Sequence, residues 1–262
     1  MSPLLSLILG LAPSLIWLCF YLRKDVHPEP KGIIVQVFFL GMLSSILAAV
    51  LESIPTIFFV SQKISLGFLP QTLTRIFSSR EGKFLFSFLG IALIEESLKY
   101  LVVKIRVLKD SEFDEPLDAM IYMITAALGF AALENILIFL SPKVFFLSTT
   151  ESLSLAGWRF AFATFLHALC SGIIGYFLGL LFFKTRKRTG LILLGLGLAT
   201  LLHGLYNFSI MVIGQGLNLI IPVFILASLA FAISRGFREL QKANIYPPPL
   251  PSTTRKQRSK IK

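Results

Sequence analysis

The feature that most constrains this chain is a series of apolar blocks, each about 20 residues long, separated by short charged stretches. A helix of this length is about 30 Å long, which matches the hydrocarbon thickness of a bilayer. The blocks are apolar on all sides, whereas the strands of a membrane β-barrel alternate with a period of two. Only 15% of the 262 residues are charged, which excludes a soluble enzyme and a disordered chain. We therefore expect an all-α, polytopic transmembrane helical bundle.

The apolar blocks predict about seven membrane spans. One further apolar segment, residues 54–69, is interrupted by Pro55, Gln62 and Lys63. This pattern is typical of an interfacial helix or a re-entrant segment rather than of a full crossing. The predicted spans are approximately 3–22, 32–51, 84–103, 117–140, 160–183, 191–212 and 218–235.

The spans and loops indicate three regions. Residues 1–83 hold the N-terminal spans and an outer loop, and residues 84–235 form the expected catalytic membrane core. Residues 236–262 are basic and Pro-rich, so we expect a disordered cytoplasmic tail. The sequence leaves the oligomeric state open.

Basic residues predict the orientation in the membrane. With the N-terminus outside, the inner segments carry 18 Lys and Arg and the outer segments carry 6, as the positive-inside rule requires. The first block has no basic residue before it and is followed by Arg23 and Lys24, which favours a span over a cleaved signal peptide. We expect a multi-pass protein of the cell membrane with a cytoplasmic C-terminus. This bias explains the net charge of +11, and no module typical of nucleic-acid binding is visible.

Ionisable side chains inside the predicted spans are the strongest indication of function. Each charge at the centre of a bilayer costs at least about 2.5–3.5 kcal/mol on insertion scales. Such groups must face one another or water, so we expect them to converge in the interior of the bundle. They are Glu95, Glu96, Lys99, Glu134, His167 and His203.

Helical spacing indicates which of these groups can meet. Lys99 follows Glu95 by four residues and Glu96 by three, so it can pair with either carboxylate. Asn207 follows His203 by four residues and therefore lies on the same helical face.

This set of side chains can hydrolyse an amide bond without a covalent nucleophile. A carboxylate can act as a general base towards water, and an imidazole can share the proton. An amide and a second imidazole can donate hydrogen bonds to an oxyanion. HExxH zinc helices, a GxSG serine element and a pair of intramembrane aspartates are all absent from the sequence.

Other interpretations stay open from the residues alone. Glu95, Glu134, His167 and His203 could supply two imidazoles and a carboxylate to a zinc ion. Intramembrane Glu, His and Lys also suit a transporter or a proton relay. The same groups could form a buried network that only orients helices, or the chain could be an inactive scaffold.

Four sequence blocks in order resemble the PrsW-type glutamic intramembrane protease family, which is distantly similar to CAAX-prenyl endopeptidases and bacteriocin-processing proteins. Together they cover about 84–212. The first, Glu95-Glu96-Ser97-Leu98-Lys99, looks like the EExxK element of that family. The others are Phe113–Asp118 with Ala127–Asn135, which includes Phe130, Glu134 and Asn135; His167-Ala168 with Ser171-Gly172; and His203–Phe208.

The resemblance implies an intramembrane endopeptidase that cleaves a membrane-associated protein, such as a membrane-bound anti-sigma factor, without a cofactor. It implies that Glu95 activates water, with Glu96 as its partner. It further implies that His203 and Asn207 bind the oxyanion, and that His167 polarises the water or protonates the leaving amine. We expect supporting roles for Lys99, Glu134, Asn135 and Phe130.

Two positions depart from the family pattern. The last block often reads HxxxD, whereas Asn207 stands in place of the aspartate here. The second block often ends ENxxY, and Ile138 occupies the position of the tyrosine. An amide can donate a hydrogen bond but cannot act as a carboxylate base, and isoleucine removes a hydroxyl. Both departures favour altered specificity or reduced activity.

Overall fold

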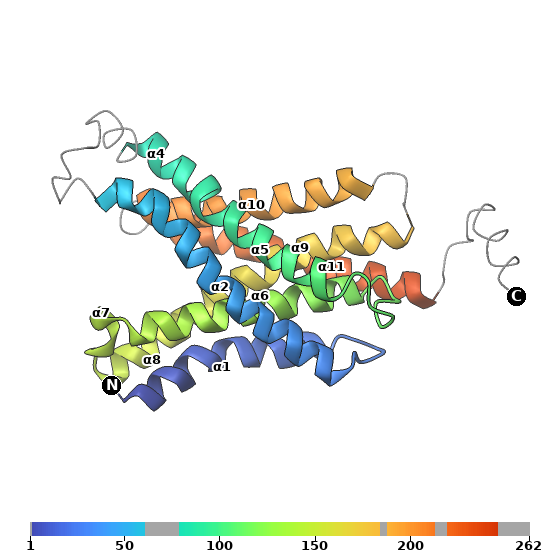
Figure 1. Cartoon of the computed structure of the whole chain (residues 1–262), viewed down its shortest axis with the longest axis horizontal. Coiled ribbons are helices and arrows are strands. Elements are labelled where there is room, and N and C mark those ends of the chain that lie inside the picture. Colours follow the sequence, from blue (N-terminus) through green and yellow to red (C-terminus); the bar gives the residue numbers. More distant parts are fainter. Residues whose placement is uncertain (1, 61–78, 184–187, 213–218, 246–262) are drawn as a thin grey trace, which may run out of the picture.

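The computed structural model describes residues 2–60, 79–183, 188–212 and 219–245, which form a helical bundle (Figure 1). The chain passes back and forth along the bundle, so that α1 begins at one end and α11 finishes at the other. In chain order the helices are α1 (Pro3–Leu22), α2 (Lys31–Val60), α4 (Arg80–Leu85), the π-helical η1 (Phe86–Ala92), α5 (Leu93–Arg106), α6 (Asp118–Leu140), α7 (Pro142–Phe145), α8 (Thr149–Trp158), the π-helical η2 (Arg159–Thr164), α9 (Phe165–Gly179), the 3₁₀ turn η3 (Leu180–Phe182), α10 (Arg188–Val212) and α11 (Ile220–Ile245).

The expectation of an all-α, multi-pass bundle is confirmed. Within the described residues, six helical stretches are long and apolar enough to cross a membrane. The span predicted at 84–103 is an additional continuous helical stretch, which runs from Arg80 to Arg106. It is about 40 Å long, but Glu95, Glu96 and Lys99 make it too charged to be recognised as a span by composition.

Some helix boundaries differ from those predicted. Helix α2 continues to Val60, so the first part of segment 54–69 extends this helix, and its residues 61–69 lie outside the described residues. The span predicted to begin at 160 is preceded by α8, which begins at Thr149. The reason is a capping box in which Ser148 and Glu151 satisfy each other's backbone N–H groups and start the helix early.

Helix α6 is the centre of the bundle. Every residue from Asp118 to Ala132 is buried, which requires neighbours on all sides of the helix. Helix α2 crosses it where Gly41 faces Ala126 and Gly129 faces Phe38. A side chain at either glycine would collide with the backbone of the other helix, so glycine permits this close approach.

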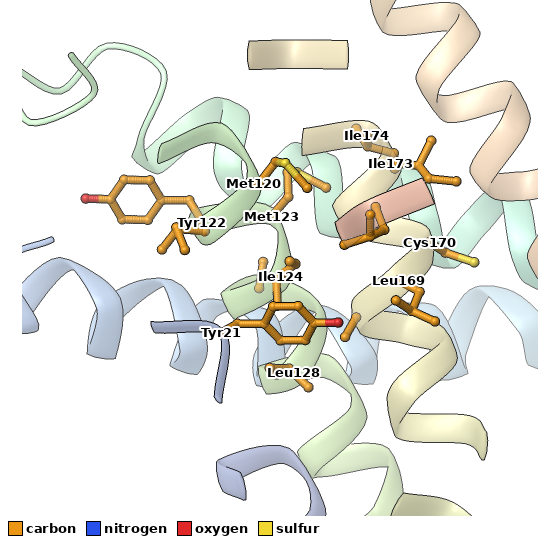
Figure 2. Close-up of a cluster of buried hydrophobic side chains, with 14 of the residues drawn as sticks. Tyr21, Met120, Tyr122, Met123, Ile124, Leu128, Leu169, Cys170, Ile173 and Ile174 are labelled. Atoms are coloured by element: carbon orange, nitrogen blue, oxygen red, sulfur yellow. The ribbon is translucent and has the colours of Figure 1, made fainter. Parts of the chain in front are cut away.

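Helices α6 and α9 share a large apolar core. Met120, Met123 and Ile124 of α6 belong to the same buried cluster as Leu169 and Ile174 of α9 (Figure 2). The same two helices also carry polar residues, which include Glu134 on α6 and His167 on α9. A rigid apolar contact between the helices therefore fixes the relative position of those polar groups.

Two π-helical stretches directly precede polar segments of the bundle. Stretch η1 ends three residues before Glu95, and η2 ends three residues before His167. Such stretches shift the helical register and are frequent at functional sites. Both therefore influence the direction in which Glu95 and His167 project.

Candidate active site

The first two turns of α5 bring three charged side chains together, as their spacing predicts. Lys99 Nζ donates to Glu95 Oε2 at 3.0 Å and to Glu96 Oε1 at 2.9 Å. It also lies 2.8 Å from His167 Nδ1 and 4.3 Å from the centre of the Phe130 ring. Lys99 is completely buried, so these partners replace water around its charge.

Both carboxylate oxygens of Glu96 contact buried hydrogen-bond donors. Its Oε1 is 2.9 Å from His203 Nδ1, in addition to its contact with Lys99. Its Oε2 accepts a hydrogen bond from Ser171 at 3.0 Å. Glu96 is completely buried. Its contacts make it an anchor for Lys99 and His203, with no oxygen directed at solvent.

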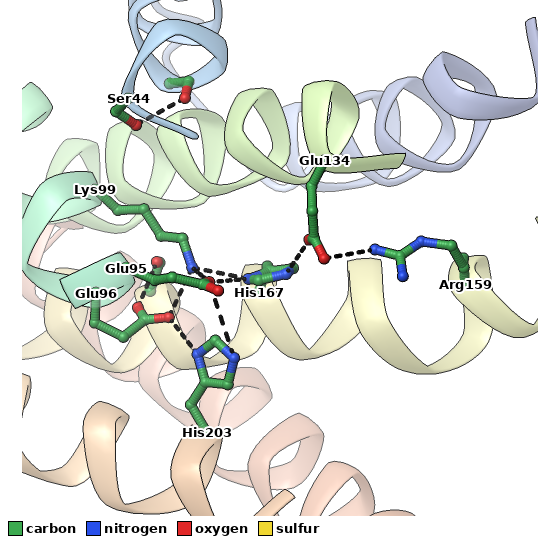
Figure 3. Close-up of polar contacts among 10 residues, drawn as sticks. Ser44, Glu95, Glu96, Lys99, Glu134, Arg159, His167 and His203 are labelled. Atoms are coloured by element: carbon green, nitrogen blue, oxygen red, sulfur yellow. Dashed lines mark hydrogen bonds and ion pairs between the residues drawn. The ribbon is translucent and has the colours of Figure 1, made fainter. Parts of the chain in front are cut away.

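His167 connects this cluster to a second ion pair (Figure 3). Its Nε2 lies 2.9 Å from Glu134 Oε2, and Glu134 Oε1 lies 3.0 Å from Arg159 Nη2. Arg159 Nε also donates to Asn135 Oδ1, and Asn135 Nδ2 donates to Thr164 at 3.0 Å. The buried imidazole is therefore held between two charged groups from different helices.

The hydrogen-bond partners determine the proton positions on both imidazoles. An ammonium has three N–H groups, and Lys99 directs them at Glu95, Glu96 and His167. Nδ1 of His167 is then an acceptor, and its Nε2–H donates to Glu134. Glu96 is an acceptor, so Nδ1–H of His203 donates to it and Nε2 of His203 is left directed towards Glu95, 3.9 Å from Oε2.

A cavity of about 590 Å³ adjoins the cluster. Glu95, Glu134, His167 and His203 line it, and they come from four helices. Glu96 and Lys99 do not line it, which separates the two neighbouring glutamates by position. The rings of His167 and His203 are perpendicular to one another, with centres 5.2 Å apart. A single water or substrate group in this cavity can therefore reach Glu95 and both imidazoles.

The remaining predicted residues occupy different places. Asn207 lines the cavity one turn from His203, and its side chain makes no hydrogen bond to any described residue. Phe130 packs against Lys99 and the His167 ring, whose centre is 5.6 Å away. Asn135 does not line the cavity and contacts Arg159 instead.

Three charged or hydroxyl-bearing residues of the cavity wall were not predicted from the sequence. Arg159 lies immediately before the span predicted at 160–183 and counts there as a loop charge, although its pairing with Glu134 places it inside the bundle. Tyr206 is 5% exposed and lines the cavity beside Asn207. Glu52 of α2 also lines it. A charge at the end of an apolar block is the signal that could have identified Glu52.

Comparisons with known proteins agree with the four blocks found in the sequence. The profile of a family described as PrsW family intramembrane metalloprotease matches residues 29–233. The chain belongs to the PrsW family. This membership decides for a membrane-embedded peptidase and against the transporter and proton-relay alternatives.

Individual relatives in this family cover most of the chain. Protease PrsW of Oceanobacillus iheyensis is 32% identical over 199 residues, which are 76% of this chain and 80% of the relative. Protease PrsW of Bacillus subtilis is 30% identical over 236 residues, 89% of this chain and 93% of the relative. Protease PrsW of Geobacillus kaustophilus is 30% identical over 203 residues, 77% and 78% of the two chains. No solved structure matches the chain.

The family description names a metalloprotease, and four residues here carry suitable donors. Ligand atoms of Glu95, Glu96, His167 and His203 all lie within 4.8 Å of one another, and imidazoles with a carboxylate suit Zn²⁺. However, the ammonium of Lys99 lies within about 3 Å of Glu95, Glu96 and His167 and already takes one lone pair of each. A metal ion would compete with this cation for the same atoms. The arrangement as it stands does not fit a metal centre.

Proposed function

We propose that this PrsW family member hydrolyses a peptide bond of a membrane-associated protein by a glutamic mechanism. The proposal rests on one observation: Glu95, His167 and His203 come from three helices and line the same cavity. Glu96 has no access to that cavity and is saturated by Lys99, His203 and Ser171. Glu95 is therefore the member of the pair that can contact water and substrate.

In the first step, Glu95 removes a proton from a water molecule. The resulting hydroxide oxygen forms a bond to the carbonyl carbon of the scissile peptide, whose oxygen becomes an oxyanion. Lys99 holds Glu95 in place by its hydrogen bond of 3.0 Å. The fixed position of the carboxylate provides the orientation that a bimolecular reaction in solution lacks.

Two groups can stabilise the oxyanion. Asn207 has N–H donors without a described partner on the cavity wall. His203 can donate from Nε2 only as an imidazolium, because its Nδ1–H is already directed at Glu96. The negative charge of Glu96 stabilises that imidazolium. In this mechanism Glu96 acts through His203 and is a positioning residue.

In the second step, the proton returns to the nitrogen of the leaving amine as the C–N bond breaks. His167 Nδ1 lies 3.5 Å from Glu95 Oε2, and Glu134 on the other side of the ring stabilises a positive imidazole. Lys99 donates both to Glu95 and to His167 Nδ1. The proton can therefore pass from Glu95 to Lys99 as Lys99 gives one of its own protons to His167 Nδ1, and it returns by the same route for the second step. Neither step requires a covalent intermediate or a metal ion.

The family resemblance supports a class of substrate, and the charge distribution supports an orientation in the membrane. We propose a membrane-anchored protein of the anti-sigma-factor type as the substrate. With the N-terminus outside and the C-terminus in the cytoplasm, the 18 inner basic residues lie on the cytoplasmic side. The cavity is then reached from the outer half of the membrane.

Cleavage of a single-pass reporter protein tests this function. Purified wild type, Glu95→Gln and His203→Ala should be compared in proteoliposomes, with Glu112→Gln as a control for an exposed loop carboxylate. We expect cleavage by wild type and Glu112→Gln and a loss of about 10²–10⁴-fold in both site variants. Equal cleavage by all four proteins would refute the proposal.

A further inference from the structure

A second cavity of about 410 Å³ is lined by residues of α1 and α11 and by Phe165 at the start of α9. Its apolar wall includes Trp17 and Phe165, whose stacked rings have centres 4.2 Å apart. Phe237 of α11 also lines it and stacks on Tyr21 of α1 with centres 5.8 Å apart. None of the residues at this cavity belongs to the candidate active site.

One end of this cavity is basic. Lys24 lies just beyond the end of α1, and Arg238 lies near the end of α11. No carboxylate is among the described residues that line the cavity. Lys24 follows Trp17 by seven positions, so the apolar and basic parts are about 10 Å apart along the helix. The cavity is therefore complementary to a lipid. Its two cations lie near the helix ends, where a charged head group would be, and its aromatic rings lie deeper in the bundle, where an acyl chain would be.

Tyr21 lies between these two parts and provides an independent indication of a ligand. It lines the cavity and is only 5% exposed. Its hydroxyl makes no hydrogen bond to any residue in the described part of the chain, although its ring stacks on Phe237. Buried tyrosine hydroxyls nearly always have a partner. A bound molecule with an oxygen at this depth would provide one.

We propose that this cavity binds one anionic phospholipid. The phosphate contacts Lys24 and Arg238, an ester oxygen accepts the hydrogen bond of Tyr21, and an acyl chain lies along Trp17 and Phe165. Basic pockets between membrane helices are known to recognise lipid head groups in this way. Two cations without an acidic neighbour in the cavity favour an anionic head group over a zwitterionic one.

Trp17 provides a direct probe of this lipid. The chain has two tryptophans, so Trp17 is the single emitter in a Trp158→Phe background. Phosphatidylglycerol brominated along its acyl chains should quench Trp17 in detergent micelles at a lower lipid fraction than brominated phosphatidylcholine. Excess inorganic phosphate should not reverse the quenching. Reversal would show that the cavity recognises only an anion and would overturn the assignment to a phospholipid.

Matched variants separate this site from general attraction to a charged surface. Lys24→Gln with Arg238→Gln should raise the half-quenching fraction of phosphatidylglycerol about tenfold. The control double variant, Arg23→Gln with Arg235→Gln, also removes two positive charges, but from positions that do not line the cavity. It should leave the half-quenching fraction unchanged.

Tyr21→Phe tests the hydroxyl without changing charge or shape. It should weaken quenching by both lipids by a few fold, because each has the same ester oxygens. Circular dichroism and thermal unfolding of each variant verify the fold. Equal quenching by the two lipids in the parent protein, or equal shifts in the two double variants, would overturn the proposal.

Discussion

Glu134 Oε2 lies 2.9 Å from Nε2 of His167 on a neighbouring helix. This contact fixes the ring, because the other ring nitrogen accepts from Lys99 at 2.8 Å. Glu134 is in turn held by Arg159 at 3.0 Å. A buried imidazole with a carboxylate behind it is well placed to carry a proton during a reaction.

Replacing Glu134 by Gln should therefore reduce kcat with little change in KM. The amide can still accept from His167, but it no longer stabilises a positive imidazole and its NH₂ group faces Arg159. We expect kcat to fall about 10²-fold, measured on a reporter substrate. A KM increase with unchanged kcat would instead indicate a role in substrate binding.

The Glu95→Gln and Glu96→Gln variants should differ in unfolding free energy as well as in activity. Glu96→Gln removes one of the two carboxylates that neutralise buried Lys99 and the carboxylate that accepts from His203, so we expect a loss of about 3–5 kcal/mol in unfolding free energy. Glu95→Gln affects a carboxylate that faces the cavity, and we expect a smaller loss together with loss of cleavage. Chemical unfolding in detergent measures the difference. The same unfolding free energy for the two variants would contradict the distinction drawn between them.

The sequence predicted the local part of this site well. Lys99 pairs with Glu95 and Glu96 because a helix brings i,i+3 and i,i+4 side chains together whatever surrounds it. The need to shield charges in a membrane also predicted that His167 and His203 turn inward. The Arg159–Glu134 pair could not be predicted, since it depends on how η2 packs beside α6 and connects residues of two helices. The overall helical fold was predictable from hydropathy, but the boundaries of α2 and α8 depend on capping and packing.

Cleavage should not depend on a divalent metal. The ammonium of Lys99 supplies the positive charge among Glu95, Glu96 and His167, so removing metals should leave the rate unchanged. Purified protein should be treated with EDTA and with 1,10-phenanthroline and then assayed, with elemental analysis of the same sample. Loss of activity that added Zn²⁺ restores, with about one bound zinc per chain, would show that Lys99 is displaced in the working enzyme.

Tyr206 should contribute to the reaction although the sequence did not identify it. Its side chain lines the cavity next to Asn207, and its hydroxyl makes no hydrogen bond within the described residues. Tyr206→Phe should lower kcat/KM about fivefold, as expected for loss of one neutral hydrogen bond. Tyr176→Phe is a suitable control, because that hydroxyl bonds to Glu239 away from the cavity. An unchanged rate for Tyr206→Phe would assign Tyr206 to packing only.

The loop between α1 and α2 should make stability depend on pH. Asp25 accepts from the backbone N–H of His27 at 3.1 Å with one oxygen, while its other, buried oxygen has no hydrogen-bond partner among the described residues. Burial, together with nearby Glu29 and Glu115, raises the pKa of Asp25 from 3.8 to about 6. The folded state therefore holds this proton more tightly than the unfolded state. Stability should fall as pH rises from about 4 to about 6.

Asp25→Asn removes the ionisation and can keep the hydrogen bond to His27. The variant should be more stable than wild type at about pH 7, by on the order of 1 kcal/mol after allowing for solvent screening, and equally stable near pH 4. Asp110→Asn should instead lower the stability at about pH 7. A hydrogen bond from Arg106 lowers the pKa of Asp110, so the ionised form of this residue stabilises the folded state. Unfolding measured across this pH range tests both. Parallel profiles for wild type and Asp25→Asn would contradict the proposed effect of burial on Asp25.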